Sequence, residues 1–156
     1  MTQGTILVKQ SPALRGEVNL SGAKNAVLVT MLSLLLAPGK STLKNIPWLD
    51  DVFVMIDILK LLGAEVVMHK AEGILEIDTT NAQEQELPLE LMQKARASVL
   101  AVGPLLARFK KVRFALPGGC TIGARPIDFH LKNFKKINIR NSSDYLKIYF
   151  LIFTKN

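Results

Sequence analysis

The chain has 156 residues, of which 49% are hydrophobic and 21% charged, a composition typical of a folded domain with a substantial core. Its longest apolar stretch, residues 26–37, is too short to cross a bilayer, and a single cysteine excludes an intrachain disulfide framework and suits a reducing cytoplasm. The net charge of +7 is concentrated in residues 133–156, and no nucleic-acid-binding motif accompanies it, so partners of that class are not expected. The first residues lack the basic start and apolar run of a signal peptide.

Hydrophobic periodicity predicts alternating strands and helices in the first half of the chain. Ser21 is a candidate cap for the first helix, Pro38 and Gly39 end that helix, and Gly63 ends the second. The dipeptide Glu72-Gly73 marks the turn of a hairpin. The expected strands are 5–9, 17–20, 41–46, 65–70 and 74–78, and the expected helices are 25–37 and 50–62.

The second half of the chain starts the same pattern again. A polar connection over 79–88 leads to a helix expected over 89–108 and a strand over 111–116. A further helix is expected to begin near Pro126, because proline is favoured in the first turn of a helix. This order repeats the order of the first half, which indicates an internal repeat whose second copy is incomplete.

The segment 117–131, PGGCTIGARPIDFHL, carries the most specific chemistry in the sequence. Gly118 and Gly119 allow a mobile or tightly turned loop around Cys120. An arginine five positions later, Arg125, can bind phosphate or carboxylate and favours the thiolate form of a nearby cysteine. The run therefore predicts a loop that closes over an anionic substrate. The alternative interpretation is a buried structural cysteine beside a turn.

Three motifs together resemble a known family. They are LSGAKNAVL at 20–28, KARASVLAVGPLLARF at 94–109 and GGCTIGARPIDFHL at 118–131. Their order and spacing are similar to those of the UDP-N-acetylglucosamine 1-carboxyvinyltransferases, the enolpyruvyl transferases that begin bacterial peptidoglycan synthesis. The resemblance runs from about residue 4 to residue 132. It implies an α/β (α+β) fold similar to an inside-out α/β barrel, in which repeated units form two lobes around the active site.

The resemblance also implies roles for individual residues. Cys120 matches the catalytic cysteine, which acts as a general acid or forms an adduct with phosphoenolpyruvate. Lys24, Asn25 and Arg125 match residues that bind phosphoenolpyruvate, and no metal or organic cofactor is implied. The residues that match the UDP-N-acetylglucosamine site are Arg96, Arg125, Pro126, Ile127, Asp128 and Phe129. Without the motifs, Lys24 and Arg96 would be interpreted as solvated helix charges, and Asp128 as a helix cap.

The resemblance divides the chain into three parts. Residues 1–21 are expected to form strands that belong with the second lobe of the whole family fold, and residues 22–132 an incomplete catalytic lobe. Residues 133–156 are rich in Lys, Asn, Ile, Phe and Tyr and match no family pattern, which indicates a frameshift or premature stop. The alternative is a divergent but genuine terminus. The stretch YLKIYFLIF within it is an aggregation risk if exposed.

The implied activity is transfer of enolpyruvyl from phosphoenolpyruvate to the 3-hydroxyl of UDP-N-acetylglucosamine, in the cytoplasm, within cell wall biogenesis, cell shape, cell division and the cell cycle. Without a second lobe, this chain is expected to be an inactive N-terminal fragment. The family is usually monomeric, but the fragment is expected to self-associate. The alternatives are a non-catalytic remnant or basic binding fragment, and the shikimate-pathway enolpyruvyl transferase, which typically has Lys-Ser where this chain has Lys24-Asn25.

Overall fold

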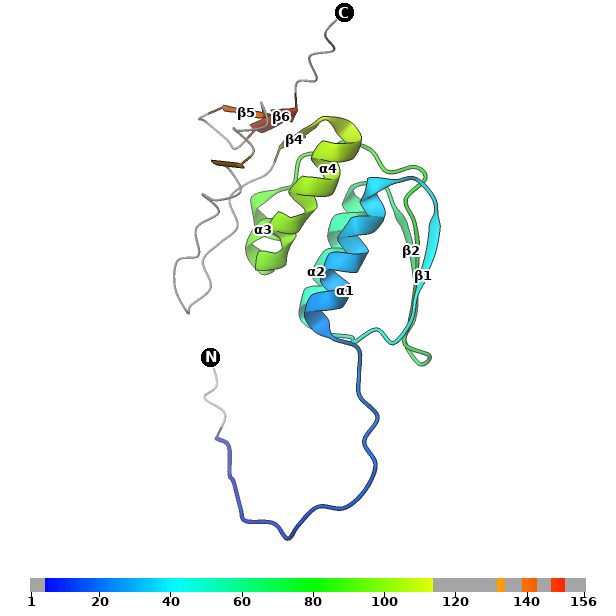
Figure 1. The fold of residues 1–156 in the computed structure, drawn as a ribbon, viewed down its shortest axis with the longest axis vertical. Coiled ribbons are helices and arrows are strands. Elements are labelled where there is room, and N and C mark those ends of the chain that lie inside the picture. Colours follow the sequence, from blue (N-terminus) through cyan, green and yellow to red (C-terminus); the bar gives the residue numbers. More distant parts are fainter. Residues whose placement is uncertain (1–4, 114–131, 134–138, 143–146, 151–156) are drawn as a thin grey trace, which may run out of the picture.

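The computed structural model describes residues 5–113, 132–133, 139–142 and 147–150 (Figure 1). Helices and strands follow one another along the described chain, and the described strands form two three-stranded sheets. The helices are α1 (Lys24–Ser33), η1 (Leu34–Leu36), α2 (Asp50–Leu61), α3 (Leu89–Lys94), η2 (Arg96–Ala101) and α4 (Val102–Phe109), where η marks a 3-10 helix. The strands are β1 (Lys40–Leu43), β2 (Glu65–His69), β3 (Ile74–Asp78), β4 (Lys111–Arg113), β5 (Ile139–Ser142) and β6 (Lys147–Phe150).

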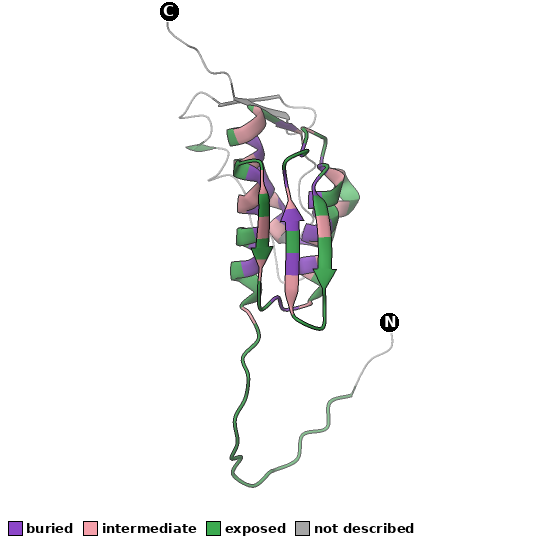
Figure 2. Ribbon diagram, turned by 90° about the vertical axis from the view of Figure 1, so that its right-hand side faces the viewer, coloured by how far each residue is buried: buried purple, intermediate pink, exposed green. Residues whose placement is uncertain are grey.

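The first sheet has the order β1-β3-β2, and its helices cover one face (Figure 2). The central strand β3 runs antiparallel to both neighbours. Leu75 and Ile77 of β3 are buried beneath the helices, whereas Glu76 between them is exposed. Because successive side chains of a strand point to opposite faces, this alternation leaves the second face of the sheet open to water.

The helical segments of the described chain share one hydrophobic core, and α1, α2 and η2–α4 run in the same direction. The ion pair between Lys24 and Asp51 joins the first turns of α1 and α2. η2 packs against α1, and α4 packs against η1, so η2–α4 follows the course of α1–η1. Fully buried side chains come from each of these segments and from the first sheet: Met31, Leu32, Leu35, Met55, Ile58, Leu59, Leu62, Leu75, Ile77, Leu87, Met92 and Leu105.

A polar junction at the far end of the helices ties these segments together. The Thr79 hydroxyl donates to the carbonyl of Ala37 at 2.9 Å, and the Thr79 amide donates to the carbonyl of Gly39 at 2.9 Å. The Arg108 guanidinium donates to the carbonyls of Thr79 at 2.9 Å and Leu35 at 3.4 Å. The carbonyls of Leu35 and Ala37 lie at the end of η1, where backbone oxygens lack helix partners, so a cation and a hydroxyl satisfy them.

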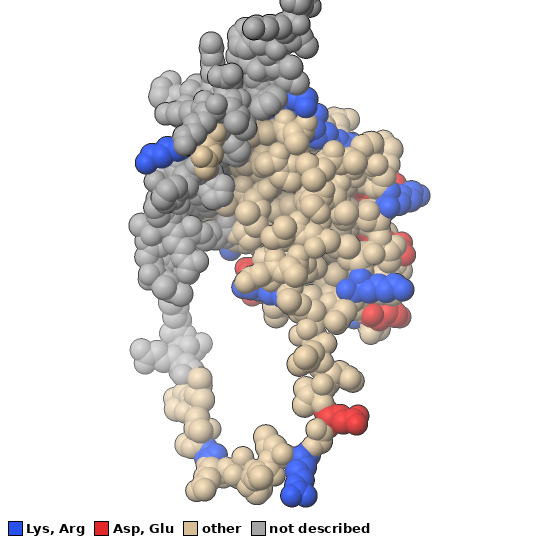
Figure 3. All heavy atoms as spheres, in the orientation of Figure 1, with Lys and Arg blue, Asp and Glu red and all other residues tan. Residues whose placement is uncertain are grey.

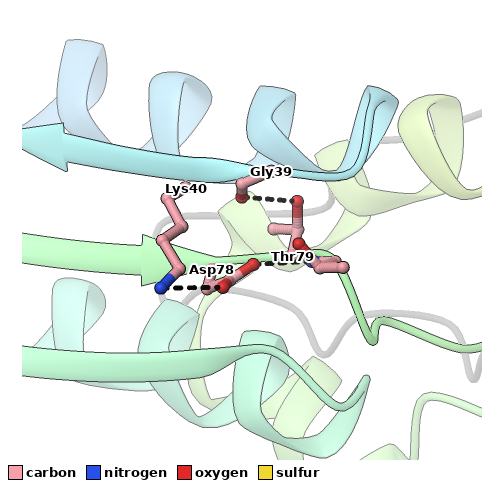
Figure 4. A network of polar contacts seen from close by, with 5 residues as sticks. Gly39, Lys40, Asp78 and Thr79 are labelled. Carbon is pink, nitrogen blue, oxygen red and sulfur yellow. Dashed lines mark hydrogen bonds and ion pairs between the residues drawn. The ribbon is translucent and has the colours of Figure 1, made fainter.

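The end of β3 is held by a second set of polar contacts beside this junction (Figure 4). The Asp78 carboxylate accepts a hydrogen bond from the Thr80 amide at 2.9 Å and lies 3.9 Å from the Lys40 ammonium. Hydrogen bonds from the Thr80 hydroxyl and amide, helped by the charge of Lys40, lower the pKa of Asp78. The charged carboxylate therefore fixes the turn that leads from β3 to Thr79.

The second sheet has the order β4-β6-β5, with β6 antiparallel to both neighbours. β4 follows directly after α4, where Lys110 takes a left-handed conformation with φ 65°. An ion pair of 2.6 Å between Lys111 and Glu84 ties the start of β4 to the connection that follows β3. Strands from 139–142 and 147–150 therefore complete a sheet that begins in the family-like part of the chain.

Most predicted elements are confirmed, including the hairpin 65–78 and the helix that begins at Asp50. The strands expected over 5–9 and 17–20 are wrong, because residues 5–20 form no helix or strand and their apolar side chains are exposed. A strand needs a neighbour to pair with its backbone, and none lies beside this arm within the described residues. Strand β1 ends at Leu43, earlier than the strand expected over 41–46. Ser21 does not cap α1, whose N-cap residue is Ala23.

The continuous helix expected over 89–108 is wrong as well. Ala95 takes an extended conformation (φ −136°, ψ 125°) that separates α3 from η2. A new α-helix then begins at Val102, which places Pro104 in its first turn. Proline lacks an amide hydrogen and is tolerated in a first turn but not inside a long helix, so Pro104 was the available signal for the break.

On the face shown in Figure 3, acidic side chains lie among Lys and Arg on the folded body, and neither charge forms a dominant patch there. Within the described residues, no helix is long and apolar enough to cross a membrane.

We expect Thr79→Val to lower the free energy of unfolding by about 1–2 kcal/mol, because the substitution keeps the side-chain shape but leaves buried carbonyls without their donor. Thr30→Val is the matched control: its hydroxyl donates to the Ala26 carbonyl at 2.9 Å on the exposed side of α1, so we expect a change within about 0.5 kcal/mol. Urea unfolding of both variants measures the difference. Equal losses would show that the buried junction has no special weight.

Candidate functional site

The start of α1 is the described part of the predicted site. Lys24 is the first residue of this helix, and no side chain among the described residues caps its amides. The Lys24 ammonium lies 2.7 Å from the Asp51 carboxylate, and both side chains remain partly exposed, at 45% and 33%. Asn25 follows Lys24 and is exposed. Unbonded amides at a helix start attract anions, and a lysine at the same place adds a full charge.

The loop between β1 and α2 fixes the backbone that enters α1. Asn45 takes a left-handed conformation with φ 58°, and its side-chain oxygen accepts a hydrogen bond of 3.1 Å from the Gly22 amide. The next amide, of Ile46, donates to the carbonyl of Gly73 at 2.9 Å. A Cβ atom at position 22 would overlap the carbonyl oxygen of Asn45. Glycine is therefore required in the motif preceding Lys24 because two backbone segments touch there.

A groove of about 370 Å³ runs beside this entry, between α1 and the end of β1. Its lining is mainly apolar and backbone, with Lys44 as its charged member, so it does not itself offer the several cations that a phosphate-bearing substrate needs. The lining residues are Gly22, Ala23, Ala26, Val27, Thr30, Thr42, Leu43, Lys44, Asn45 and Ile46.

The parallel course of the helices brings predicted site residues to the same end of the fold. Arg96 is the first residue of η2, which packs against α1, so its backbone lies at the end of the helices where Lys24 lies. Strand β4 follows α4 and reaches Arg113, the last described residue before the predicted loop.

The other predicted site residues fall on segments without a described position. Cys120, Arg125, Pro126, Ile127, Asp128 and Phe129 lie outside the described residues, and so does the side chain of Arg96. The geometry of the site is thus available for Lys24, Asn25 and their neighbours. In the described part of the chain, no group of three or more His, Cys, Asp and Glu residues is arranged to hold a metal ion.

Two further residues at this site were not identified from the sequence. Asp51 holds the Lys24 ammonium, and Asn45 holds the backbone before it. The acidic pair Asp50-Asp51 begins α2, and nothing in its spacing connects it with a lysine 27 positions earlier. The signal for Asn45 was its position in a short connection, where Asn tolerates a left-handed conformation.

The sequence matches the family model described as EPSP synthase (3-phosphoshikimate 1-carboxyvinyltransferase) over residues 8–150. It is 44% identical over 133 residues to UDP-N-acetylglucosamine 1-carboxyvinyltransferase 1 of Clostridium acetobutylicum, which covers 85% of this chain and 32% of that protein. It is 46% identical over 134 residues to the UDP-N-acetylglucosamine 1-carboxyvinyltransferase of Thermotoga maritima, covering 86% of this chain and 31% of that protein. The chain thus spans about a third of the length of these curated relatives.

Solved structures share the fold at low sequence identity. The enolpyruvyl transferase NikO of Streptomyces tendae superposes with a TM-score of 0.72 at 20% identity and covers 87% of this chain and 30% of that one. The EPSP synthase of Acinetobacter baumannii superposes with a TM-score of 0.64 at 15% identity, over 86% of this chain and 32% of that one. The expected α/β enolpyruvyl transferase fold is therefore confirmed.

We expect Gly22→Ala to destabilise the chain by about 2 kcal/mol, because the new methyl group forces the Asn45 carbonyl and the start of α1 apart. Ser21→Ala is the control at the neighbouring exposed position, and a change within about 0.5 kcal/mol is expected there because Ser21 does not cap the helix. Denaturant unfolding of both variants gives the two values. A neutral Gly22→Ala variant would contradict the close approach of the two segments.

Proposed function

Because the chain belongs to the family of enolpyruvyl transferases that the EPSP synthase model describes, we propose that it forms part of an enzyme acting on UDP-N-acetylglucosamine. The enzyme transfers the enolpyruvyl group of phosphoenolpyruvate to the 3-hydroxyl of the sugar and releases phosphate. The observation that carries this proposal is the 44–46% identity to UDP-N-acetylglucosamine 1-carboxyvinyltransferases over about 85% of the chain. The reaction belongs to peptidoglycan synthesis and takes place in the cytoplasm, where a lone cysteine stays reduced.

The proposed chemistry uses groups with different tasks. The sugar hydroxyl loses its proton to a general base as its oxygen attacks C2 of phosphoenolpyruvate, and a proton is delivered to C3. The tetrahedral intermediate then loses phosphate from C2 and a proton from C3, which restores the carbon–carbon double bond. Cys120 supplies the proton or a transient covalent bond, because a thiol titrates near neutrality. Lys24 and Arg125 stabilise the phosphate and the developing charge, and Asn25 contacts the same substrate. Arg96 and residues 125–129 hold the nucleotide sugar.

The ion pair at the start of α1 supports the role of Lys24. The Lys24 ammonium faces Asp51 at 2.7 Å and keeps 45% of its side chain exposed. A partly exposed ion pair contributes little to stability, so a phosphate group can replace or join the carboxylate at small cost. In this proposal Asp51 positions the lysine side chain until an anion arrives, and the open amides of α1 receive the same anion.

The shape of α1 supports the view that this chain acts together with further polypeptide. Val29 of α1 and Leu36 of η1 are half exposed, at 52% and 53%, while Met31 and Leu35 are buried. Large apolar side chains that stay exposed on helices are groups that a further layer of protein would cover. The chain covers 32% of its Clostridium relative, and the remaining repeats of that fold are the natural cover for this helix.

Two alternatives differ from this proposal by specific features. A shikimate-pathway enzyme would fit the description of the family model, but it typically carries Lys-Ser where this chain has Lys24-Asn25 and lacks a loop like that of Cys120. A non-catalytic remnant or basic binding fragment would fit the short coverage of the relatives. An enzyme completed with the second lobe can be assayed with UDP-N-acetylglucosamine and with shikimate 3-phosphate. Activity with the first, with the second or with neither distinguishes the three candidates.

We expect a chimera to be active in which residues 1–132 of this chain replace the matching part of the Clostridium relative. Lys24→Ala and Cys120→Ala should each lower kcat/KM by about 100-fold or more, because each removes a group that acts on phosphoenolpyruvate. Lys60→Ala is the charge-matched control, since Lys60 lies exposed in the last turn of α2, away from the start of α1. Phosphate release from phosphoenolpyruvate and UDP-N-acetylglucosamine is the assay.

Activity of the chimera with shikimate 3-phosphate instead would favour the sister reaction. A folded but inactive chimera would favour the non-catalytic remnant.

We expect the 156-residue chain by itself to show no turnover, because a cleft enzyme with one wall lacks the orientation and electrostatic terms that dominate such catalysis. The same phosphate-release assay on the purified chain, with Cys120→Ala as a blank, tests this. Turnover that depends on Cys120 would show that the groups described above are sufficient.

A further inference from the structure

The segment 133–156, which matches none of the motifs that define the family-like part, contributes two strands to the fold. β5 and β6 pair with β4 in the order β4-β6-β5, and the third strand along the chain lies in the centre. The first sheet has the same arrangement, β1-β3-β2, with its third strand in the centre. In both sheets the central strand is antiparallel to both neighbours.

The register of the pair β1 and β3 also corresponds to that of the pair β4 and β6. In the first sheet Lys40 is paired with Asp78, and in the second Lys111 is paired with Tyr149. Both members of the second pair lie 71 positions after their counterparts, 111 against 40 and 149 against 78. The next two pairs keep this offset, since Ser41↔Ile77 corresponds to Val112↔Ile148 and Thr42↔Glu76 to Arg113↔Lys147. A chance pairing of an unrelated tail has no reason to reproduce this register.

The hairpins and the helices follow the same plan. Four residues, 70–73, connect β2 to β3, and four residues, 143–146, connect β5 to β6. α1–η1 precedes β1, and η2–α4 precedes β4, with α4 packed against β6. The family match continues to residue 150, the last residue of β6.

We propose that residues 133–150 complete a second structural unit of the same plan as the first, and hold β4 in place by pairing along it. A three-residue strand such as β4 is marginal without a neighbour, yet Val112 in its centre is buried, at 1% exposure. Main-chain hydrogen bonds supply this pairing and need no particular side chains, so a divergent sequence can fill the role. Ile148, Tyr149 and Phe150 have the β-branched and aromatic side chains that strands favour.

This proposal is independent of the proposed function, and it changes what the segment is expected to do. An appendage would expose its apolar residues, and its removal would improve solubility. A segment that pairs with β4 instead protects the edge of that strand, and its removal would expose the edge. The two roles predict opposite effects of deleting residues 133–156.

Hydrogen exchange measured by mass spectrometry on the intact chain tests the pairing. We expect peptides covering 139–142 and 147–150 to exchange at least about tenfold more slowly than peptides from 5–20, which form no helix or strand and serve as the internal reference. Ile148→Pro should remove this protection and that of 111–113 while leaving 65–78 protected. Ile6→Pro, in the exposed arm, is the matched control and should change none of them.

Cysteine pairs test the register separately from stability. In a Cys120→Ser background, Val112→Cys with Ile148→Cys places two thiols on directly opposed residues, within the range of a disulfide. Val112→Cys with Lys147→Cys is shifted by one residue, so the two side chains point to opposite faces of the sheet. We expect mild oxidation to cross-link the first pair and not the second. Equal cross-linking of both pairs, or exchange in 139–150 as fast as in 5–20, would overturn the proposal.

Discussion

The hydrogen bonds of the Arg108 guanidinium are the contacts on which the arrangement of the described chain depends. The guanidinium reaches from α4 to the Leu35 carbonyl in η1 and to the carbonyl of Thr79 after β3. These three elements belong to different parts of the sequence, and the junction fixes the end of each at one place. A charged donor among backbone carbonyls satisfies several acceptors at once, which an apolar side chain at position 108 would leave unpaired.

Because this junction joins the ends of η1 and α4, the segments α1–η1 and η2–α4 lie side by side. Their starts therefore lie near each other at the opposite end. α1 and α2 begin side by side, with Lys24 and Asp51 in contact, and η2 begins nearby with Arg96. Parallel helices bring their partial positive charges to one end, and Asp50 and Asp51 partly offset that charge in α2. The start of α1, which carries a lysine and no acidic residue in its first turn, is left as the anion-friendly end.

The same architecture explains why the described chain leaves so much apolar surface open. The arm 5–20 exposes Ile6, Leu7 and Val8 by more than three quarters, and α1 exposes Val29 and Leu36. The curated relatives are about three times as long as this chain. Sheet pairing, by contrast, is satisfied within the chain, because β3 and β6 each lie between two neighbours. The exposed apolar side chains therefore lie on helix faces and in the arm, whereas the central strands have neighbours on both sides.

Much of this could be predicted from the sequence, and the remainder has a common cause. Local signals determined the hairpin 65–78, the helix at Asp50 and the end of the α1–η1 segment before Pro38, because turns, caps and periodicity act over a few residues. The family resemblance predicts Lys24 and Asn25 as site residues, and the structure gives the surroundings of Lys24. Pro104 carried the signal for the broken helix, and it was outweighed by the apolar run around it.

Only the tertiary structure decided the contacts between residues that are far apart in the chain. Asp51 beside Lys24, Asn45 against Gly22 and Arg108 beneath Leu35 join positions 27, 23 and 73 residues apart. The absence of strands in 5–20 and the pairing of 147–150 with β4 have the same origin. A strand exists only where a second backbone satisfies its hydrogen bonds, so composition predicts the tendency of a segment and its neighbours decide the outcome.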